Sequence, residues 1–176
     1  TILDNEDFLQ LASKYIQKKG YREAMDYYIE CHTPQLVVSS ENGDIELKTS
    51  KSILGTVTKS DLSVHKSLLR CRRFQNIYTT NYDNVLEFTS KVLSEEEPYS
   101  SYNIVESGKK LSGNLSRNII KIHGSICDDK NDFQFDGDSH LRYIIAQEDY
   151  DTYMEKHEAF SYLMRIAMLQ GVFCLV

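Results

Sequence analysis

The chain has 176 residues, of which 41% are apolar and 26% are charged, a composition typical of a globular domain with its own core. No apolar run approaches the ~20 residues that a membrane helix needs, so we expect no membrane partner. The formal net charge of -6 argues against direct nucleic-acid binding, which depends on cations that neutralise phosphates.

The first third of the chain predicts two helices and one short strand. Asp4 is a suitable N-cap, and apolar residues recur at helical spacing from Phe8 to Ile16, before Gly20 provides a stop signal. A second apolar stripe over residues 21–29 ends at Thr33 and the proline that follows it. Residues 36–38 are compatible with a strand, whereas residues 39–52 are polar, with a turn at 41–44.

Strands alternate with helices from about residue 60 onward. Asp61 is the predicted cap of a helix, and a strand at 75–79 and a helix at 84–94 follow. The polar residues 95–117 contain a strand near 102–105, interpreted as part of a hairpin, and a further strand follows at 118–122. Beyond a polar loop at 125–140, we predict a strand at 141–146, a long helix at about 148–169 and an apolar strand at 172–176. This alternation predicts an α/β fold with a parallel sheet flanked by helices.

Polar side chains follow two of these strands at the point where each strand ends. Asn81 and Asp83 come after the strand at 75–79, and His123 and Gly124 come after the strand at 118–122. Right-handed crossovers bring the carboxyl ends of parallel strands to one edge, where open sheets bind ligands. One of the polar residues is also expected to cap the helix that begins near Asn84, so each signal alone is weak. The two together predict a site at this edge of the sheet.

The sequence gives no sign of a metal site. The four cysteines at positions 31, 71, 127 and 174 form no C-x-x-C pair, which predicts free thiols in a reducing cytoplasm. The acidic loop at 128–138 has Gly137 where a calcium loop needs glycine, but Tyr143 stands where that loop requires a bidentate glutamate. We therefore expect no bound metal and a cytoplasmic location.

Three motifs resemble those of a known family. Residues 79–83, Thr-Thr-Asn-Tyr-Asp, resemble the T-Q-N-I-D signature of sirtuins, and residues 121–125, Lys-Ile-His-Gly-Ser, resemble their strand-end His-Gly. The match is closer to the divergent sirtuin-like domains of bacterial anti-phage defence proteins, which read T-T-N-Y-D, K-x-H-G-S and I-x-x-E-D-Y in this order. The third motif falls here within residues 144–150.

This resemblance implies that residues 1–176 belong to one Rossmann-like NAD+-binding domain. In the family, a Gly-Ala-Gly loop lies upstream of these motifs, and a G-F-S-G-x-D-P-like stretch follows the last strand. Neither occurs in this sequence, which starts at Thr1 and stops within a predicted strand. We therefore expect the domain to be incomplete at both ends, as the middle of a longer protein.

The resemblance also implies a reaction. Deacylating sirtuins carry a zinc ribbon of two C-x-x-C pairs after the His-Gly, whereas only Cys127 follows it in this region. The implied reaction is therefore hydrolysis of NAD+, as a substrate, to nicotinamide and ADP-ribose without a metal, through oxocarbenium-like charge on the ribose.

The family assigns roles to the strand-end residues. Asn81 is implied to hold the ribose and the attacking water, or the nicotinamide amide, and His123 to act as a base. Asp83 is implied to bind the nicotinamide amide or to stabilise the positive charge. The implied cofactor-binding residues are Thr79, Thr80, Tyr82, Asp83 and Gly124. Thr80 replaces the sirtuin glutamine, and Tyr82 also suits a packing role.

The implied partners lie outside the chain. We expect an effector domain of an abortive-infection defence protein, a homo-oligomer restrained by a sensor domain or by a partner protein such as a phage-derived trigger. Two alternatives stay open: a non-catalytic module that senses NAD+ or ADP-ribose, and an NAD+-dependent protein deacylase.

Overall fold

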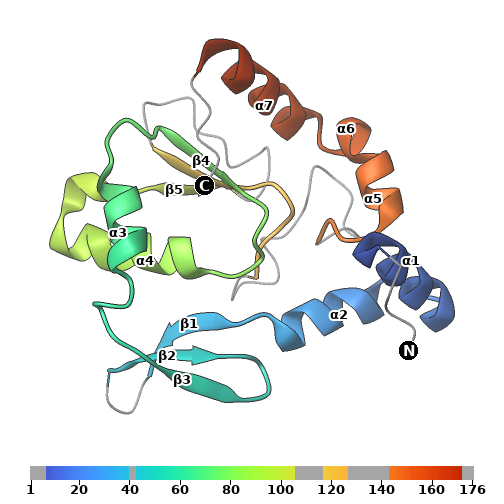
Figure 1. Cartoon of the computed structure of the whole chain (residues 1–176), viewed down its shortest axis with the longest axis horizontal. Helices are drawn as coiled ribbons and strands as arrows, with labels where there is room; N and C mark the ends of the chain where they lie inside the picture. The colour runs from blue at the N-terminus through green and yellow to red at the C-terminus, as the bar shows by residue number, and fades with distance from the viewer. Residues whose placement is uncertain (1–6, 40–42, 106–116, 127–142, 172–176) are drawn as a thin grey trace.

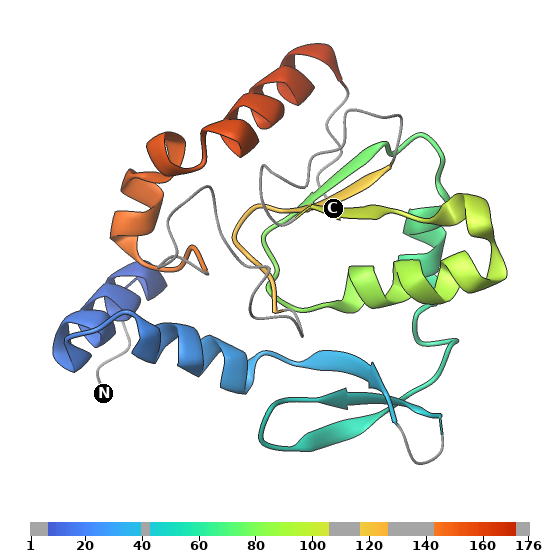
Figure 2. The ribbon, with the colours of Figure 1, turned by 180° about the vertical axis from the view of Figure 1, so that it is seen from behind.

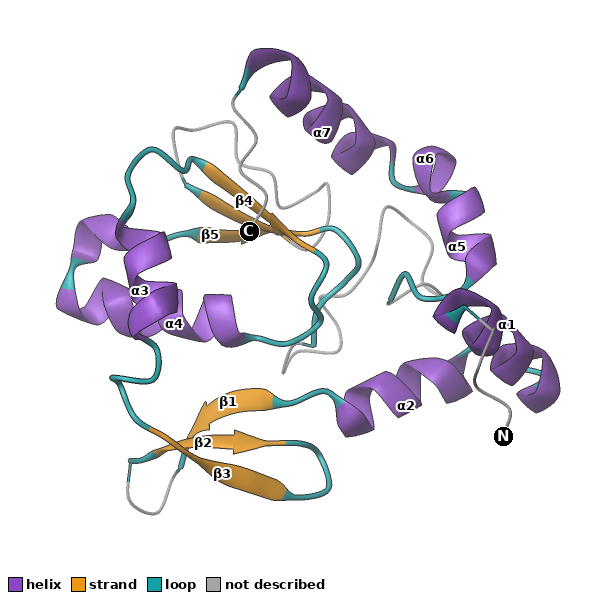
Figure 3. Cartoon of the chain, in the orientation of Figure 1, coloured by secondary structure: helices purple, strands orange, loops and turns teal. Residues whose placement is uncertain are grey.

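The computed structural model of the chain describes residues 7–39, 43–105, 117–126 and 143–171 (Figure 1). Two three-stranded sheets and the surrounding helices make up this part of the chain (Figure 3). In chain order the elements are α1 (Phe8–Lys19), α2 (Glu23–His32), β1 (Gln35–Val38), β2 (Ile45–Lys48), β3 (Ile53–Val57), α3 (Ser63–Arg70), β4 (Asn76–Thr79), α4 (Val85–Glu96), the 3-10 helix η1 (Pro98–Ser100), β5 (Asn103–Val105), β6 (Asn118–Lys121), α5 (Gln147–Asp151), α6 (Tyr153–Lys156) and α7 (Glu158–Gln170).

The second sheet confirms the predicted fold class, a Rossmann-like α/β arrangement. Its strands are parallel in the order β4-β6-β5, and the register pairs Asn76 with Asn118 and Thr79 with Lys121. Successive side chains of a strand point to opposite faces, so the apolar strand β6 is covered on both sides.

Helices cover the two faces of this parallel sheet (Figures 1 and 2). Ile119 lies in a cluster with Leu69 of α3 and Leu93 of α4. Ile120 faces the other way, in a cluster with Phe160 of α7. All five side chains are at most 1% exposed, so the centre of the core is β6.

The first sheet is an antiparallel meander, β1-β2-β3, which the sequence does not predict beyond β1. The polar stretch at 39–52 contains β2, and β3 follows it directly. Leu36 and Ile45 of this sheet pack with Phe88 and Val92 of α4 and with Leu62. The meander is therefore attached to the outer side of the α3–α4 layer.

Three expectations about the second half of the chain are corrected. The strand β5 pairs with β6 in parallel, so residues 103–105 are not part of a hairpin. Residues 143–146 of the strand predicted at 141–146 have no strand structure. The long helix is broken into α5, α6 and α7 at Thr152 and His157. At the first break the Thr152 hydroxyl donates to the Glu148 carbonyl over 2.8 Å, a back-bond that bends helices.

The structure also differs from the sequence prediction at two N-caps. Asp7, not Asp4, is the N-cap of α1, where it accepts from the amide of Leu9. Asp61 accepts from the amide and hydroxyl of Thr58 and makes no cap contact with α3. The C-cap of α1 at Gly20 is confirmed by its left-handed backbone, with φ 78°.

Some predictions lie outside the described residues: Asp4, the acidic loop at 128–138, and the strand at 172–176. Within the described ranges, none of the helices has the length and apolar character that spanning a membrane requires.

Candidate functional site

The carboxyl ends of β4 and β6 lie side by side, and we call this border of the sheet the carboxyl edge. Thr79 pairs with Lys121, and Asn81 and His123 each follow two residues later. The two chain segments stay connected past the strands, because the Ile122 amide donates to the Thr79 carbonyl over 3.1 Å. The register therefore brings the two predicted strand-end motifs to one edge of the sheet.

The turn at 79–83 is fixed mainly by its own polar groups. The amide of Asn81 donates to the Thr79 hydroxyl over 3.1 Å. Asp83 Oδ1 accepts from the amide of Val85, the first residue of α4, over 3.0 Å, whereas the N-cap residue Asn84 makes no side-chain cap bond. Thr80 and Asn81 are exposed, and the Asn81 side chain makes no hydrogen bond to any part of the chain that the structure describes. This leaves the Asn81 amide available to a ligand.

Asn84 connects this turn to the meander. Its Oδ1 accepts from the Leu36 amide over 2.7 Å, and its Nδ2 donates to the Leu36 carbonyl over 2.9 Å. A primary amide that bonds both backbone groups of one residue imitates a neighbouring strand. These two bonds add to the packing of Leu36 on α4 and hold β1 against the start of that helix.

Tyr82 packs into the protein rather than standing at the surface of the edge. Its hydroxyl donates to the Ile144 carbonyl over 2.6 Å, and its ring meets the Tyr143 ring edge-on at 5.3 Å. Burial raises the pKa of Tyr82 above its ordinary value, which keeps the phenol protonated. The first motif thus contacts the residues that begin the third.

His123 is half-buried between Tyr150 of α5 and Tyr153 of α6. Its Nδ1 lies 3.4 Å from the Tyr150 hydroxyl, and its ring centroid lies 5.2 Å from that of Tyr150 and 6.4 Å from that of Tyr153. Burial lowers the pKa of His123 below 6.5, and the nearby His157 lowers it further. His123 is therefore neutral at pH 7 and able to accept a proton.

The backbone beside His123 requires glycine. Gly124 has φ 95°, in the left-handed region where a Cβ is strained, and its amide donates to the Lys121 carbonyl over 3.3 Å. The Tyr153 hydroxyl donates to the Ile122 carbonyl over 2.9 Å. These two contacts fix the chain direction on both sides of His123.

A buried ion pair lies beneath the edge. Lys121, whose side chain is 1% exposed, lies 2.9 Å from Glu87 Oε1 of α4 and also donates to the Asp83 carbonyl. The Ser125 hydroxyl donates to the same carboxylate oxygen over 3.2 Å. Burial raises the pKa of Glu87, although Lys121 opposes that rise. The pair joins both strand-end motifs to α4.

The third motif is anchored by Asp149. One carboxylate oxygen accepts from the amides of Ile145 and Ala146, and the other accepts from Arg22 of the α1–α2 connection over 2.7 Å. Arg22 also donates to the Tyr143 carbonyl. This arrangement fixes the start of α5, from which Tyr150 reaches His123.

Sequence reasoning found Asn81, Asp83 and His123 but gave no role to Tyr150, Lys121 or Glu87. Tyr150 was visible as the last letter of the third motif. Lys121 was visible as a lysine inside an otherwise apolar strand, where an unpaired charge is costly and a partner is expected. Nothing in the local sequence marks Glu87 as that partner.

Across the described ranges there is no group of three or more histidine, cysteine or acidic side chains arranged to hold a metal. Residues 75–174 match the model of a family described as the SIR2-like domain. The match covers more than half of the 176 residues and includes all three motifs. No curated protein matches the chain.

Proposed function

Because this chain belongs to the SIR2-like domain family, we propose that it hydrolyses NAD+ to nicotinamide and ADP-ribose. SIR2-like domains bind NAD+, and an NAD-related activity is what the family indicates in general. One observation carries the proposal further: the parallel register of β4 and β6, which brings an unbonded amide and a neutral imidazole to the same edge.

At ribose C1′ the reaction breaks one bond and forms one, and the attacking water gives up a proton. The bond between the nicotinamide nitrogen and ribose C1′ breaks, its electron pair leaves with the neutral nicotinamide, and positive charge develops on the ribose. Water adds to C1′ and loses one proton, so that NAD+ and water give nicotinamide, ADP-ribose and H+. The protein has to position the water, accept its proton and stabilise the charge.

His123 is the base in this proposal. Its lowered pKa keeps the ring neutral, and its Nδ1 is engaged with the Tyr150 hydroxyl. When Nδ1–H donates to Tyr150, Nε2 has the free lone pair that takes the proton from water or from a ribose hydroxyl. Tyr150 is then a positioning residue that sets the tautomer.

The other strand-end residues bind the substrate in this proposal. The exposed amide of Asn81 holds the ribose and the water, or the nicotinamide amide. Asp83 uses Oδ1 for the Val85 amide and keeps Oδ2 for the nicotinamide amide or for the developing charge. Thr79, Thr80 and Gly124 form the backbone against which the nucleotide lies, and Tyr82 supports them from behind.

We assign the activity to anti-phage defence because the three motifs follow the pattern of the defence-associated sirtuin-like domains. Loss of NAD+ stops metabolism in an infected cell, so such an enzyme has to be restrained until infection. The proposal therefore includes a homo-oligomer and a sensor domain or trigger protein outside these 176 residues.

Nicotinamide release under activating conditions tests the proposal. The variants are Asn81→Ala and His123→Ala, and the matched controls are Asn76→Ala and His32→Ala. Asn76 lies at the opposite end of β4 from Asn81, and His32 is an exposed histidine of α2. We expect the first two variants to lose about 100-fold or more in rate, as for a removed general base, and the controls to retain it.

The outcomes separate the alternatives. Activated protein that binds NAD+ without releasing nicotinamide would be a sensing module, and the hydrolase proposal would be wrong. Turnover that depends on an acylated peptide would identify a deacylase. Equal losses in the Asn81 and Asn76 variants would mean that the effect is structural.

A further inference from the structure

A cavity lies at the amino-terminal border of the parallel sheet, opposite the carboxyl edge. Gln75 directly precedes β4 and Arg117 directly precedes β6, and both line this cavity. Arg72 and Tyr99 complete the lining, and the volume is about 510 Å³. A volume of roughly 300–1,000 Å³ is usual for small-molecule sites.

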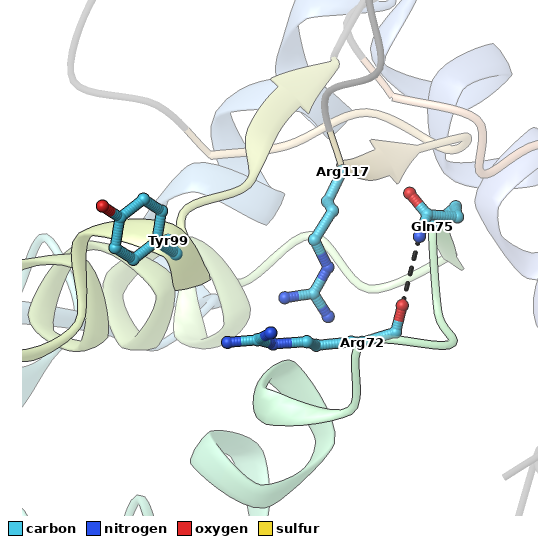
Figure 4. Close-up of a pocket in the computed structure, with 4 residues that line it drawn as sticks. All are labelled: Arg72, Gln75, Tyr99 and Arg117. Atoms are coloured by element: carbon cyan, nitrogen blue, oxygen red, sulfur yellow. Dashed lines mark hydrogen bonds between the residues drawn. The ribbon is translucent and has the colours of Figure 1, made fainter.

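The guanidinium group of Arg117 points toward Arg72, whose side chain extends beneath it in this cavity (Figure 4). Arg117 is held rigidly, because it donates to the carbonyls of Phe74 and Cys71 and to the Tyr102 hydroxyl and lies 4.1 Å over the Tyr102 ring. These partners are all neutral. The Nη1 atom of Arg117 makes no hydrogen bond to the residues that the structure describes.

Arg72 is also without a counter-charge. Its side chain is exposed and makes no ion pair or hydrogen bond with the described ranges, and only its backbone carbonyl is used, by Gln75 Nε2 over 3.1 Å. The nearby Glu97 already pairs with Arg70 over 3.0 Å and accepts from Ser100. Two cations that line one cavity and have no counter-charge among the described residues, in a chain of net charge -6, favour a bound anion.

Tyr99 adds a flat apolar surface to these charges. Its ring is 90% exposed and lies on the rim of the cavity, across from the arginines (Figure 4). An exposed ring of this kind offers a stacking surface for a planar group. Paired guanidinium groups suit the oxygen atoms of a phosphate.

We propose that this cavity binds a mononucleotide, with its phosphate between Arg72 and Arg117 and its base on Tyr99. The site is separate from the carboxyl edge, since it lies at the opposite ends of the same two strands. The inference rests on the two arginines and the exposed Tyr99 ring and does not require NAD+ hydrolysis.

Calorimetric titration of the full chain with AMP, ribose 5-phosphate and adenosine tests the site. The key variant is Arg72→Glu, and its control is Arg73→Glu, which makes the same charge change at the next exposed residue without touching the cavity. Tyr99→Ala tests the stacking surface. Asn81→Ala tests whether AMP binds at the carboxyl edge instead.

We expect Arg72→Glu to weaken AMP binding by about 10- to 100-fold, the usual contribution of a hydrogen bond to a charged group. Arg73→Glu and Asn81→Ala should change it by less than about threefold. Tyr99→Ala should weaken AMP by about fivefold or more and leave ribose 5-phosphate unchanged. Adenosine should not bind measurably, because it lacks the phosphate.

Several results would overturn the proposal. One is the absence of AMP binding up to about 1 mM. A second is an equal loss of AMP affinity in Arg72→Glu and Arg73→Glu. A third is a loss of AMP binding in Asn81→Ala while Arg72→Glu retains it. Equal effects of Tyr99→Ala on AMP and ribose 5-phosphate would remove the base from the assignment. Circular dichroism of each variant checks that the fold is intact.

Discussion

Lys121→Met tests whether the buried ion pair supports the carboxyl edge. Methionine keeps much of the length of the lysine stem and removes its charge. The change leaves the Glu87 carboxylate, whose Oε2 has no hydrogen-bond partner among the described residues, without the cation 2.9 Å from its Oε1. Breaking a buried pair on one side costs about 3–5 kcal/mol, so we expect a loss of unfolding free energy of this size at pH 8.

The loss should depend on pH with a definite sign. Burial already raises the pKa of Glu87 above its ordinary value of 4.5, and removal of the opposing Lys121 raises it further. The folded variant then holds a proton more tightly than the unfolded chain. The stability contributed by Glu87, measured as the difference between the variant and the unaltered chain, is fully present below pH 4.5 and is lost as the pH rises through the folded pKa of Glu87.

Urea unfolding followed by circular dichroism measures both effects, provided that the denaturant slope is unchanged. The matched control is Lys66→Met. Lys66 is also buried and lies 2.9 Å from Glu96, but the Glu96 side chain is 36% exposed and stays solvated without it. We expect the control to cost about 1 kcal/mol or less.

A double variant completes the test. Lys121→Met with Glu87→Leu removes both charges and should recover most of the stability that Lys121→Met loses. A cost for Lys121→Met no larger than that of Lys66→Met, or strict additivity of the Lys121 and Glu87 changes, would refute the argument.

Three further changes test the local geometry. His157→Gln should raise the pKa of His123 in an NMR pH titration, because His157 adds to the lowering of that pKa by burial. The stability linked to His123 is present above pH 6.5 and is lost as the pH falls through the folded pKa of His123. An unchanged pKa would remove His157 as a cause. Gly124→Ala should cost about 1–3 kcal/mol in thermal unfolding, since φ is 95°, and a neutral result would mean that the turn adapts. Asn84→Ala should cost about 1–3 kcal/mol and speed hydrogen exchange at the Leu36 amide, and unchanged exchange would show that another group replaces the side chain.

The parallel sheet was predictable because its signals are local. β4 and β6 are short apolar runs that end at polar residues, and helical stripes separate such runs along the chain. The shared edge that Asn81 and His123 follow is then set by the handedness of the crossovers. The pairing partner of β5 is not a local property, and the hairpin interpretation of residues 103–105 was therefore wrong.

The meander was missed for a physical reason. Four of the five residues of β3 are exposed, so this strand has no alternating apolar face from which a sequence pattern could arise. Its pairing partner β2 has only one buried residue, Ile45. In addition to the packing of Leu36 on α4, Asn84 fixes the adjacent strand β1 through two hydrogen bonds to the backbone of Leu36, and a hydrophobic pattern does not show such bonds.

The breaks at Thr152 and His157 are equally invisible to helical periodicity. Apolar spacing continues across both residues, yet His157 is 2% exposed and its ring lies 4.7 Å from that of Tyr153. The chain changes direction there and brings α7 onto the sheet face opposite α4. The single straight helix predicted over 148–169 lacks this change of direction.

Hydrogen bonds connect the three motifs of this chain to one another. Tyr82 of the first motif donates to the Ile144 carbonyl in the third, Lys121 of the second donates to the Asp83 carbonyl in the first, and Tyr150 of the third meets His123 of the second. Each motif thus supplies a hydrogen bond that shapes another. A change in one should alter the geometry of the other two, so substitutions at Tyr82 and Tyr150 should be non-additive in their effect on the titration of His123. Additive effects would mean that the three motifs act separately.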